Sequence, residues 1–294
     1  MIFKYLQQMR KLFFTALTLS LCASAAQAQK LYVRGMLGFA VANAGQTTDD
    51  TRSPHSGSML YTAPSTGATP VLTSFKLKSV SFNTGIQTSL ALGYMFNNNV
   101  GVELGADIGI AHIEHEGQIT APSSNSSAYT VTQFYSQYVK NPIILTPALC
   151  LQSGGKKINI YTRAGLAVPV RSNITTEIGQ ITTATGTNSS RSINLGYTTT
   201  TAFSLGFSGA AGVKYAVNSK LQLGAEISAV SLSLYLDKLE FTSYSENGVD
   251  LFSRLPEESK RISYGKSGGS GVEPTYSVPF SNVGLKVGVF YTLK

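Results

Sequence analysis

The chain has 294 residues and a formal net charge of +8. Only 13% of its residues are charged, against roughly 25% in ordinary soluble domains, so an ordinary water-facing surface is hard to build from this composition. The cations are spread along the chain without a basic run, which argues against a nucleic-acid-binding protein.

The first residues have the pattern of an export signal. Lys4, Arg10 and Lys11 precede an apolar stretch from Leu12 to about Ala23, and the small-residue site Ala26-Gln27-Ala28 follows. The apolar stretch is about a dozen residues long, which is too short for a membrane-spanning helix of roughly 20 residues. We predict cleavage after Ala28.

This cleavage divides the chain into a signal peptide over residues 1–28 and one domain over residues 29–294. The signal holds three cations and no acid, so its removal lowers the net charge from +8 to +5. Cys22 leaves with the signal, and Cys150 stays as the only thiol. An intramolecular disulfide is therefore excluded in the mature chain.

After the signal, the sequence alternates between segments with a period of two and connections that are in turn very short and very long. Each segment has about 14 to 18 residues and is predicted to be a strand. The predicted strands are 31–44, 81–96, 100–115, 135–152, 158–172, 203–217, 221–236 and 279–293. The short connections are the polar turns 97–99, 153–157 and 218–220.

Short turns on one side and long loops on the other are typical of an outer-membrane barrel. The fold class is therefore all-β: a closed up-and-down antiparallel transmembrane β-barrel of eight strands, with long external loops and short periplasmic turns. Ten strands are the alternative, if parts of loop one (about 45–80) or loop four (about 237–278) insert. The long loops could also carry strand extensions above the membrane.

Alternation within the strands predicts which face meets lipid. In the second strand Ile86, Leu90 and Leu92 share one face, while the other carries small and polar residues such as Ser89 and Gly93. The narrow lumen of an eight-stranded barrel needs small side chains, so the apolar face is predicted to point outward. The predicted interfacial aromatic residues are Tyr94, Phe96, Tyr215, Phe290 and Tyr291, although Phe290 has the parity of the lumen.

Two segments carry a resemblance to a known family: Gly93 to Gly105 across a turn, and Tyr161 to Leu166 in the fifth strand. With these, the mature chain resembles the small outer-membrane barrel superfamily of the outer-membrane protein A and X types, including long-looped porin-like relatives of the Bacteroidetes. The resemblance implies the bacterial outer membrane as location. It also implies outer-membrane lipid, lipopolysaccharide and the barrel-assembly machinery as partners.

The last strand looks like the assembly signal that the insertion machinery of this superfamily reads. The residues that match it are Lys286, Gly288, Tyr291 and Leu293. The chain departs from the usual form because it ends on Lys294 and not on an aromatic residue.

Ionisable residues lie mid-strand on the small-residue face, where they are predicted to share the lumen. These residues are Arg34, Glu103, Asp107, Lys140, Arg163, Lys214, Glu226 and Lys286. A lone buried charge is costly, so we expect a structural network of paired ions that plugs a closed barrel. The alternative is a charged pore or proton path.

Catalytic, cofactor and metal sites are not expected. His112, Glu114, His115 and Glu116 suggest a metal site by residue type, but side chains alternate along a strand, so three could converge only if the strand bent. We interpret them as a polar strand end. All three histidines, His55, His112 and His115, lie in or next to predicted external loops, and no motif joins one to a Ser and an acid. The chain is therefore expected not to be an enzyme, and the alternative is a rim-site enzyme that acts on lipid or peptide.

The functional hypothesis is a non-enzymatic outer-membrane barrel with a role in envelope integrity and in surface interaction, meaning adhesion or binding through its external loops. A host molecule or another envelope component is the expected ligand, and nucleic acid is not. The alternative function is a small-solute pore, and the structural rival is a soluble secreted ligand-binding barrel.

Overall fold

The computed structural model describes most of the chain after the predicted signal peptide. The signal itself lies outside the described residues, so its cleavage stays a prediction. The described ranges are 30–43, 46–48, 77–79, 81–110, 115–123, 126–184, 189–265 and 272–293.

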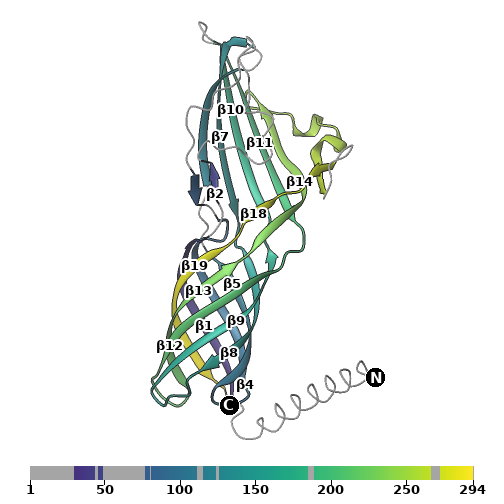
Figure 1. Cartoon of the computed structure of the whole chain (residues 1–294). Helices are drawn as coiled ribbons and strands as arrows, with labels where there is room; N and C mark the ends of the chain where they lie inside the picture. Colours follow the sequence, from purple (N-terminus) through teal and green to yellow (C-terminus); the bar gives the residue numbers. More distant parts are fainter. Residues whose placement is uncertain are drawn as a thin grey trace, which may run out of the picture.

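Eight antiparallel strands close into a barrel in the lower part of the molecule (Figure 1). They are β1 (Lys30–Ala42), β4 (Gly85–Met95), β5 (Val100–Gly109), β8 (Ile143–Gln152), β9 (Ile158–Arg171), β12 (Gly206–Ala216), β13 (Leu221–Ser231) and β19 (Asn282–Thr292). Their order around the wall is β1-β19-β13-β12-β9-β8-β5-β4. The predicted eight-stranded up-and-down barrel is confirmed, and the ten-stranded alternative is wrong.

Closure depends on β1, which pairs with the last strand on one edge and with β4 on the other. Tyr32 lies opposite Thr292 of β19 and opposite Gly93 of β4. Every barrel strand thus has a neighbour on both sides, which leaves no sheet edge. This is the condition that a β-sheet must meet inside lipid, because unpaired backbone groups there cost several kcal/mol each.

A second sheet, here called the upper sheet, stands on the end of the barrel away from the tight turns (Figure 1). Its order is β17-β16-β14-β11-β10-β7-β6. Its strands are β6 (His115–Ser123), β7 (Ser126–Val139), β10 (Ile174–Ala184), β11 (Ser190–Thr201), β14 (Ser233–Glu246), β16 (Arg261–Gly265) and β17 (Val272–Pro274). The loops that follow β5, β9 and β13 therefore carry strand extensions beyond the barrel.

Short elements complete the upper part. They are β2 (Gln46–Thr48), β3 (Leu77–Ser79), β15 (Val249–Asp250), β18 (Ser277–Pro279) and the 3-10 helices η1 (Phe252–Arg254) and η2 (Glu257–Lys260). β15 and β18 both pair with β14. No helix in the described part of the chain is long and apolar enough to cross a membrane.

The single strand predicted over 135–152 is wrong, because the chain breaks between β7 and β8. Asn141 has a φ of 48° and is followed by Pro142, which has no N–H to continue the ladder. Lys140 lies at this break and is exposed. Its predicted place in the lumen is therefore wrong, since period-two parity does not carry across the bend.

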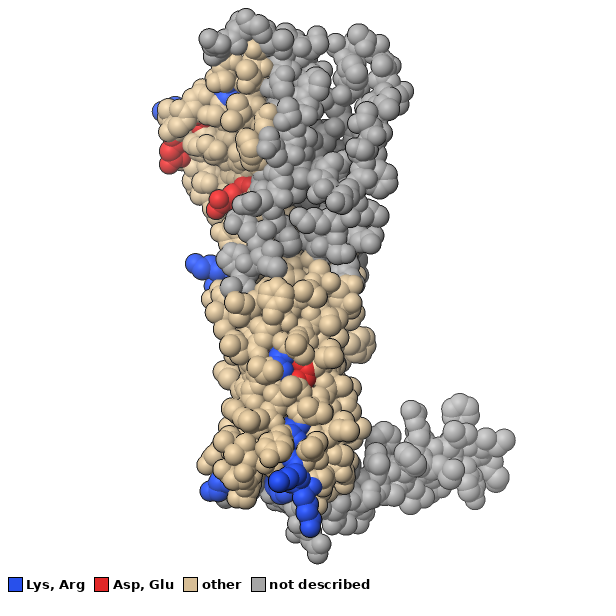
Figure 2. Space-filling model, turned by 90° about the vertical axis from the view of Figure 1, so that its left-hand side faces the viewer, with Lys and Arg blue, Asp and Glu red and all other residues tan. Residues whose placement is uncertain are grey.

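The predicted faces of the barrel are confirmed. Leu104 and Leu285 point outward, with exposed fractions of 58% and 63%, while Glu103 and Lys286 beside them are buried. On the face shown in Figure 2 the barrel is mostly uncharged, apart from one cation beside one acid midway along it, and Lys and Arg gather at the turn end. Phe290 is only 3% exposed and faces the lumen, so its place in the aromatic belt is wrong.

An arginine on the outward face tests this assignment. Leu104→Arg should lower the free energy of unfolding by about 2 to 4 kcal/mol, because the charge would lie near the middle of the apolar band. Val249→Arg, at an exposed apolar residue of β15 in the upper part, is the matched control and should change little. Urea unfolding in lipid vesicles measures the stability of both variants. Equal losses of stability would contradict the assignment of the apolar face to lipid.

Candidate functional site in the barrel lumen

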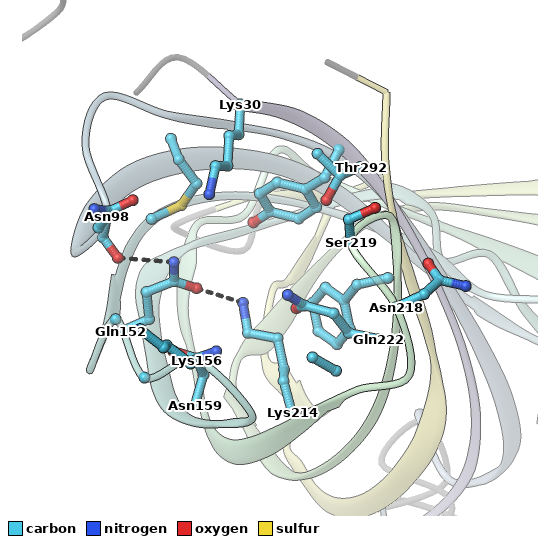
Figure 3. Close-up of a pocket in the computed structure, with 16 residues that line it drawn as sticks. Lys30, Asn98, Gln152, Lys156, Asn159, Lys214, Asn218, Ser219, Gln222 and Thr292 are labelled. Carbon is cyan, nitrogen blue, oxygen red and sulfur yellow. Dashed lines mark hydrogen bonds between the residues drawn. The ribbon is translucent and has the colours of Figure 1, made fainter. Parts of the chain in front are cut away.

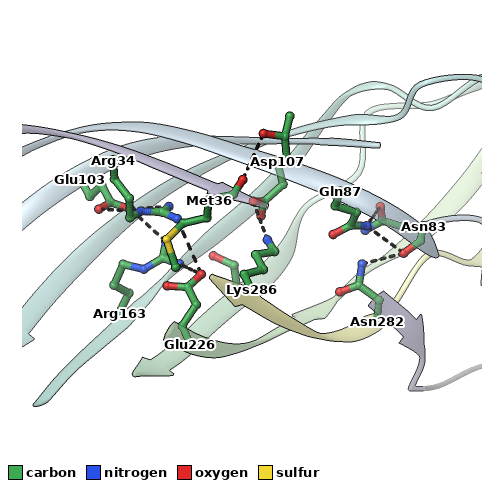
Figure 4. Close-up of polar contacts among 12 residues, drawn as sticks. Arg34, Met36, Asn83, Gln87, Glu103, Asp107, Arg163, Glu226, Asn282 and Lys286 are labelled. Carbon is green, nitrogen blue, oxygen red and sulfur yellow. Dashed lines mark hydrogen bonds and ion pairs between the residues drawn. The ribbon is translucent and has the colours of Figure 1, made fainter. Parts of the chain in front are cut away.

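Four charged side chains meet in the middle of the lumen and form a closed ring of ion pairs, here called the charge ring (Figure 4). Arg34 Nη2 lies 2.9 Å from Glu103 Oε1, and Arg34 Nη1 lies 3.7 Å from Glu226 Oε1. Arg163 binds the same two carboxylates, at 2.9 Å to Glu103 and 2.7 Å to Glu226. Each guanidinium therefore contacts both carboxylates.

The barrel order explains why the charges alternate. The four residues come from β1, β13, β9 and β5, which are every second strand around the wall. In that order the side chains are Arg34, Glu226, Arg163 and Glu103, so cation and anion alternate around the barrel axis. The side chain of Arg163 is 9% exposed and the other three are fully buried.

Two tyrosines complete the hydrogen bonding of the carboxylates. Tyr32 donates its hydroxyl to Glu103 Oε2 at 2.9 Å, and Tyr161 donates to Glu226 Oε2 at 2.7 Å. Glycines make room for both rings: a Cβ at Gly93 would overlap the Tyr32 ring, and one at Gly212 would lie 2.9 Å from Tyr161 Cε1. The small residues of the lumen face thus allow large polar side chains from neighbouring strands to fill it.

The sequence analysis did not single out these tyrosines. A signal was present, since Tyr32 and Tyr161 each stand two residues before an arginine of the charge ring and so share its face of the strand.

A second ion pair lies further along the lumen, away from the turns (Figure 4). Lys286 Nζ is 2.7 Å from Asp107 Oδ1. Beyond it, Gln87 donates to Asn83 Oδ1 at 2.9 Å, and Asn282 donates to the Asn83 carbonyl at 2.6 Å. This part of the lumen is therefore filled by polar contacts between side chains.

An apolar cluster, here called the apolar cap, lies where the barrel meets the upper sheet. Its buried members are Phe82, Val139, Ile144, Ala167, Ile174, Val230, Leu232, Leu234, Leu236, Val278 and Phe280. Leu232 joins the segment after β13 to the segment before β19. Its N–H donates to Ser281 Oγ at 2.9 Å, and its carbonyl accepts from the Phe280 N–H at 3.0 Å. The lumen is thus layered, with ions in the middle and hydrocarbon at the upper end.

Two of the eight predicted lumen charges do not join these ion pairs. Lys140 lies outside the lumen, as described above. Lys214 lies inside, but it donates to the amide oxygen of Gln152 at 2.7 Å and to no carboxylate among the described residues. Its Nζ also lies over the rings of Phe290, at 4.6 Å, and Tyr161, at 4.8 Å. Sequence parity placed it correctly but could not assign its partner.

The other candidate residues are placed as follows. Lys286 is buried in the lumen, whereas Tyr291 and Leu293 are exposed on the outer face, so the predicted assembly signal spans both faces of β19 and the residues after it. His112 and Glu114 lie outside the described residues. Among the described residues, no group of three His, Cys, Asp or Glu side chains could hold a metal ion.

Comparisons with known proteins give one family match. Residues 13–249 match the model of the outer membrane protein beta-barrel domain. This match begins within the predicted signal peptide and ends before β19, which closes the barrel. No curated protein matches the chain.

Solved structures resemble the chain only distantly. The attachment invasion locus protein Ail of Yersinia pestis has 9% sequence identity and a TM-score of 0.27, with 90% of this chain and 97% of that chain covered. OmpT of Vibrio cholerae has 8% identity and a TM-score of 0.10, with 91% and 98% covered. The assignment therefore rests on the family model and the closed barrel: the chain belongs to the outer membrane protein beta-barrel domain family, whose members are placed in the bacterial outer membrane.

Proposed function

We propose that this chain is a non-enzymatic outer-membrane barrel with a closed interior, which supports envelope integrity and presents the upper sheet for adhesion or binding at the cell surface. The observation that carries the proposal is the charge ring. Its arginines and glutamates are buried, paired across the barrel axis and hydrogen-bonded to tyrosines. Charges held in this way fill a lumen and do not line an open path.

The apolar cap supports the same function. A hydrated ion or polar solute that passed the charge ring and the Lys286–Asp107 pair would then meet Phe280 and Leu234, which are fully buried among other apolar side chains. Transfer of a polar group into such surroundings without hydrogen bonds is unfavourable by several kcal/mol. Two barriers of different chemistry thus lie in series, which supports the closed barrel over the small-solute pore.

The upper sheet supports the surface role because it projects an ordered structure beyond the lipid. On its outward face Phe134 and Ile181 are exposed apolar residues on adjacent strands. Arg191 of β11 forms two hydrogen bonds to Glu246 of β14, at 2.7 and 2.9 Å, and this contact lowers the pKa of the Glu246 carboxyl. Paired strands of this kind can hold a ligand with little loss of entropy.

The proposal includes the route to the membrane. Export would end with cleavage after Ala28, and the assembly machinery would read the signal of Lys286, Gly288, Tyr291 and Leu293 in the last strand. Outer-membrane lipid and lipopolysaccharide would then surround the apolar band. A host or envelope ligand would bind at the upper sheet.

Removal of one carboxylate tests the structural role of the charge ring. Glu103→Gln should lower the free energy of unfolding by about 3 to 5 kcal/mol, because two buried guanidinium groups would share one carboxylate. It should add little conductance in planar bilayers, because the apolar cap stays intact. Urea unfolding and bilayer recordings measure the two effects.

Glu257→Gln is the matched control, since it removes an exposed carboxylate paired with Lys260 in η2 and should leave the unfolding midpoint unchanged. Unchanged stability of Glu103→Gln, with a large gain in conductance, would instead make the barrel a gated channel.

Shortening the β10–β11 hairpin tests the surface role. Glu177 and Gly196 are paired, so residues 178–195 can be replaced by an Asn-Gly turn. In a strain that lacks the gene, the shortened chain should restore vancomycin exclusion as the full-length chain does, but not adhesion to cultured epithelial cells. The Glu103→Gln chain, whose upper sheet is intact, is the control and should retain adhesion per folded molecule. Full adhesion by the shortened chain would contradict the proposal.

A further inference from the structure

A cavity of about 480 Å³ opens at the turn end of the barrel, below the charge ring (Figure 3). In outer-membrane barrels this end faces the periplasm. Tyr32 and Phe290 lie toward its inner end, and residues of all three tight turns, including Asn98, Gly154 and Ser219, form its rim. Its volume lies in the range of small-molecule sites, which is about 300 to 1,000 Å³.

Among the described residues, the charges that line this cavity are all of one sign. They are those of Lys30, Lys156 and Lys214, and no described Asp or Glu lines the cavity. In Figure 3, Lys30 and Lys214 extend into the opening from well-separated parts of the wall. The amides of Asn159 and Gln222 also line the cavity. An anion in the opening would therefore meet cations from two strands and a turn, and no like charge from the described part of the wall.

Lys214 is the residue that most needs such a partner. It is only 6% exposed. The lumen carboxylates of Glu103 and Glu226 bind two arginines, and Asp107 binds Lys286, so the contacts of Lys214 are an amide and aromatic rings. An ammonium group has three donors, and the single hydrogen bond to Gln152 leaves capacity for an anion. A charge that is removed from water without gaining a carboxylate partner destabilises the folded protein, and a bound anion would reverse this destabilisation.

Asn159 adds a polar amide to the lining of the cavity. Its side chain is 6% exposed, and its Oδ1, which has no hydrogen-bond partner within the described structure, is itself shielded from the cavity. The buried group that a ligand would contact is therefore the ammonium of Lys214.

We propose that this turn-end cavity binds a small soluble anion, one that carries two or more carboxylate or phosphate groups. The charged groups would contact Lys214 inside and Lys30 and Lys156 at the rim. A lipid headgroup has the same anionic chemistry. However, the cavity lies in the lumen, enclosed by the barrel wall, whereas lipid surrounds the outer face of the barrel. A soluble anion from the periplasm reaches it without crossing the sheet.

Calorimetric titration of citrate into the full-length mature protein, purified in nonionic detergent, tests the proposal. The wild type should bind one citrate with a saturable isotherm. Lys214→Met, which keeps the length of the side chain and removes its charge, should weaken binding about tenfold or more, as expected for a lost charge-assisted hydrogen bond. Lys30→Gln combined with Lys156→Gln, at the more exposed rim, provides a second test if Lys214→Met does not fold.

Lys157→Gln is the matched control, because Lys157 is the neighbour of Lys156 in the same turn but does not line the cavity. Binding by this variant should stay within about twofold of wild type, since an exposed charge outside the site is largely screened. If Lys156→Gln and Lys157→Gln lowered the affinity for citrate equally, the binding would be a general attraction to a basic rim. This result would overturn the proposed binding site. Absence of saturable binding by the wild type would overturn it as well.

Nanodiscs separate the two sources of anion. In about 0.5 M salt, which screens the charge of the bilayer surface, citrate affinity should be the same in phosphatidylglycerol and phosphatidylcholine discs if the ligand is soluble. A loss confined to phosphatidylglycerol discs under these conditions would mean that a lipid headgroup takes the cavity, and would overturn the assignment to a soluble anion. These outcomes do not depend on conductance or adhesion, so they are independent of the proposed surface role.

Discussion

The charge ring is the constraint on which the rest of the barrel depends. Arg34, Glu226, Arg163 and Glu103 bring two charges of each sign to one level of a lumen with little access to water. Buried ions are tolerated only when each is paired and hydrogen-bonded, so the ring fixes which residues may stand around it. Tyrosines must reach the carboxylates, and glycines on neighbouring strands must leave space for the tyrosine rings.

The layers of the lumen follow from this constraint. Above the ring, Lys286 and Asp107 form a neutral pair, and the apolar cap then separates the barrel interior from the upper sheet. Below the ring, Lys214 has no carboxylate partner among the described residues, and the cavity beside it opens toward the turns. We therefore propose a role in stability for the ion-filled middle and a role in binding for the open lower end.

Much of this arrangement was predictable from the sequence because period-two parity is a local property. The inward positions of Glu103, Arg163 and Glu226 followed from it, as did the outward apolar face. Pairing was not predictable, because it depends on how strands far apart in the chain are ordered and staggered around the wall. Period-two parity also gave the wrong location for Lys140, because Asn141 and Pro142 break the strand there. The extent of the upper sheet required the structure, since loop sequences rich in Ser, Thr and Gly show weak alternation.

The central claim is that the lumen is closed, and single-channel recording of the wild-type protein in planar lipid bilayers tests it most directly. The protein should be extracted from purified outer membranes, with its folded state verified by a shift in gel migration on boiling. The account predicts no stable unitary conductance, because the charge ring and the apolar cap block the lumen in series. A reproducible open level of fixed amplitude from the folded protein would contradict it and establish the small-solute pore.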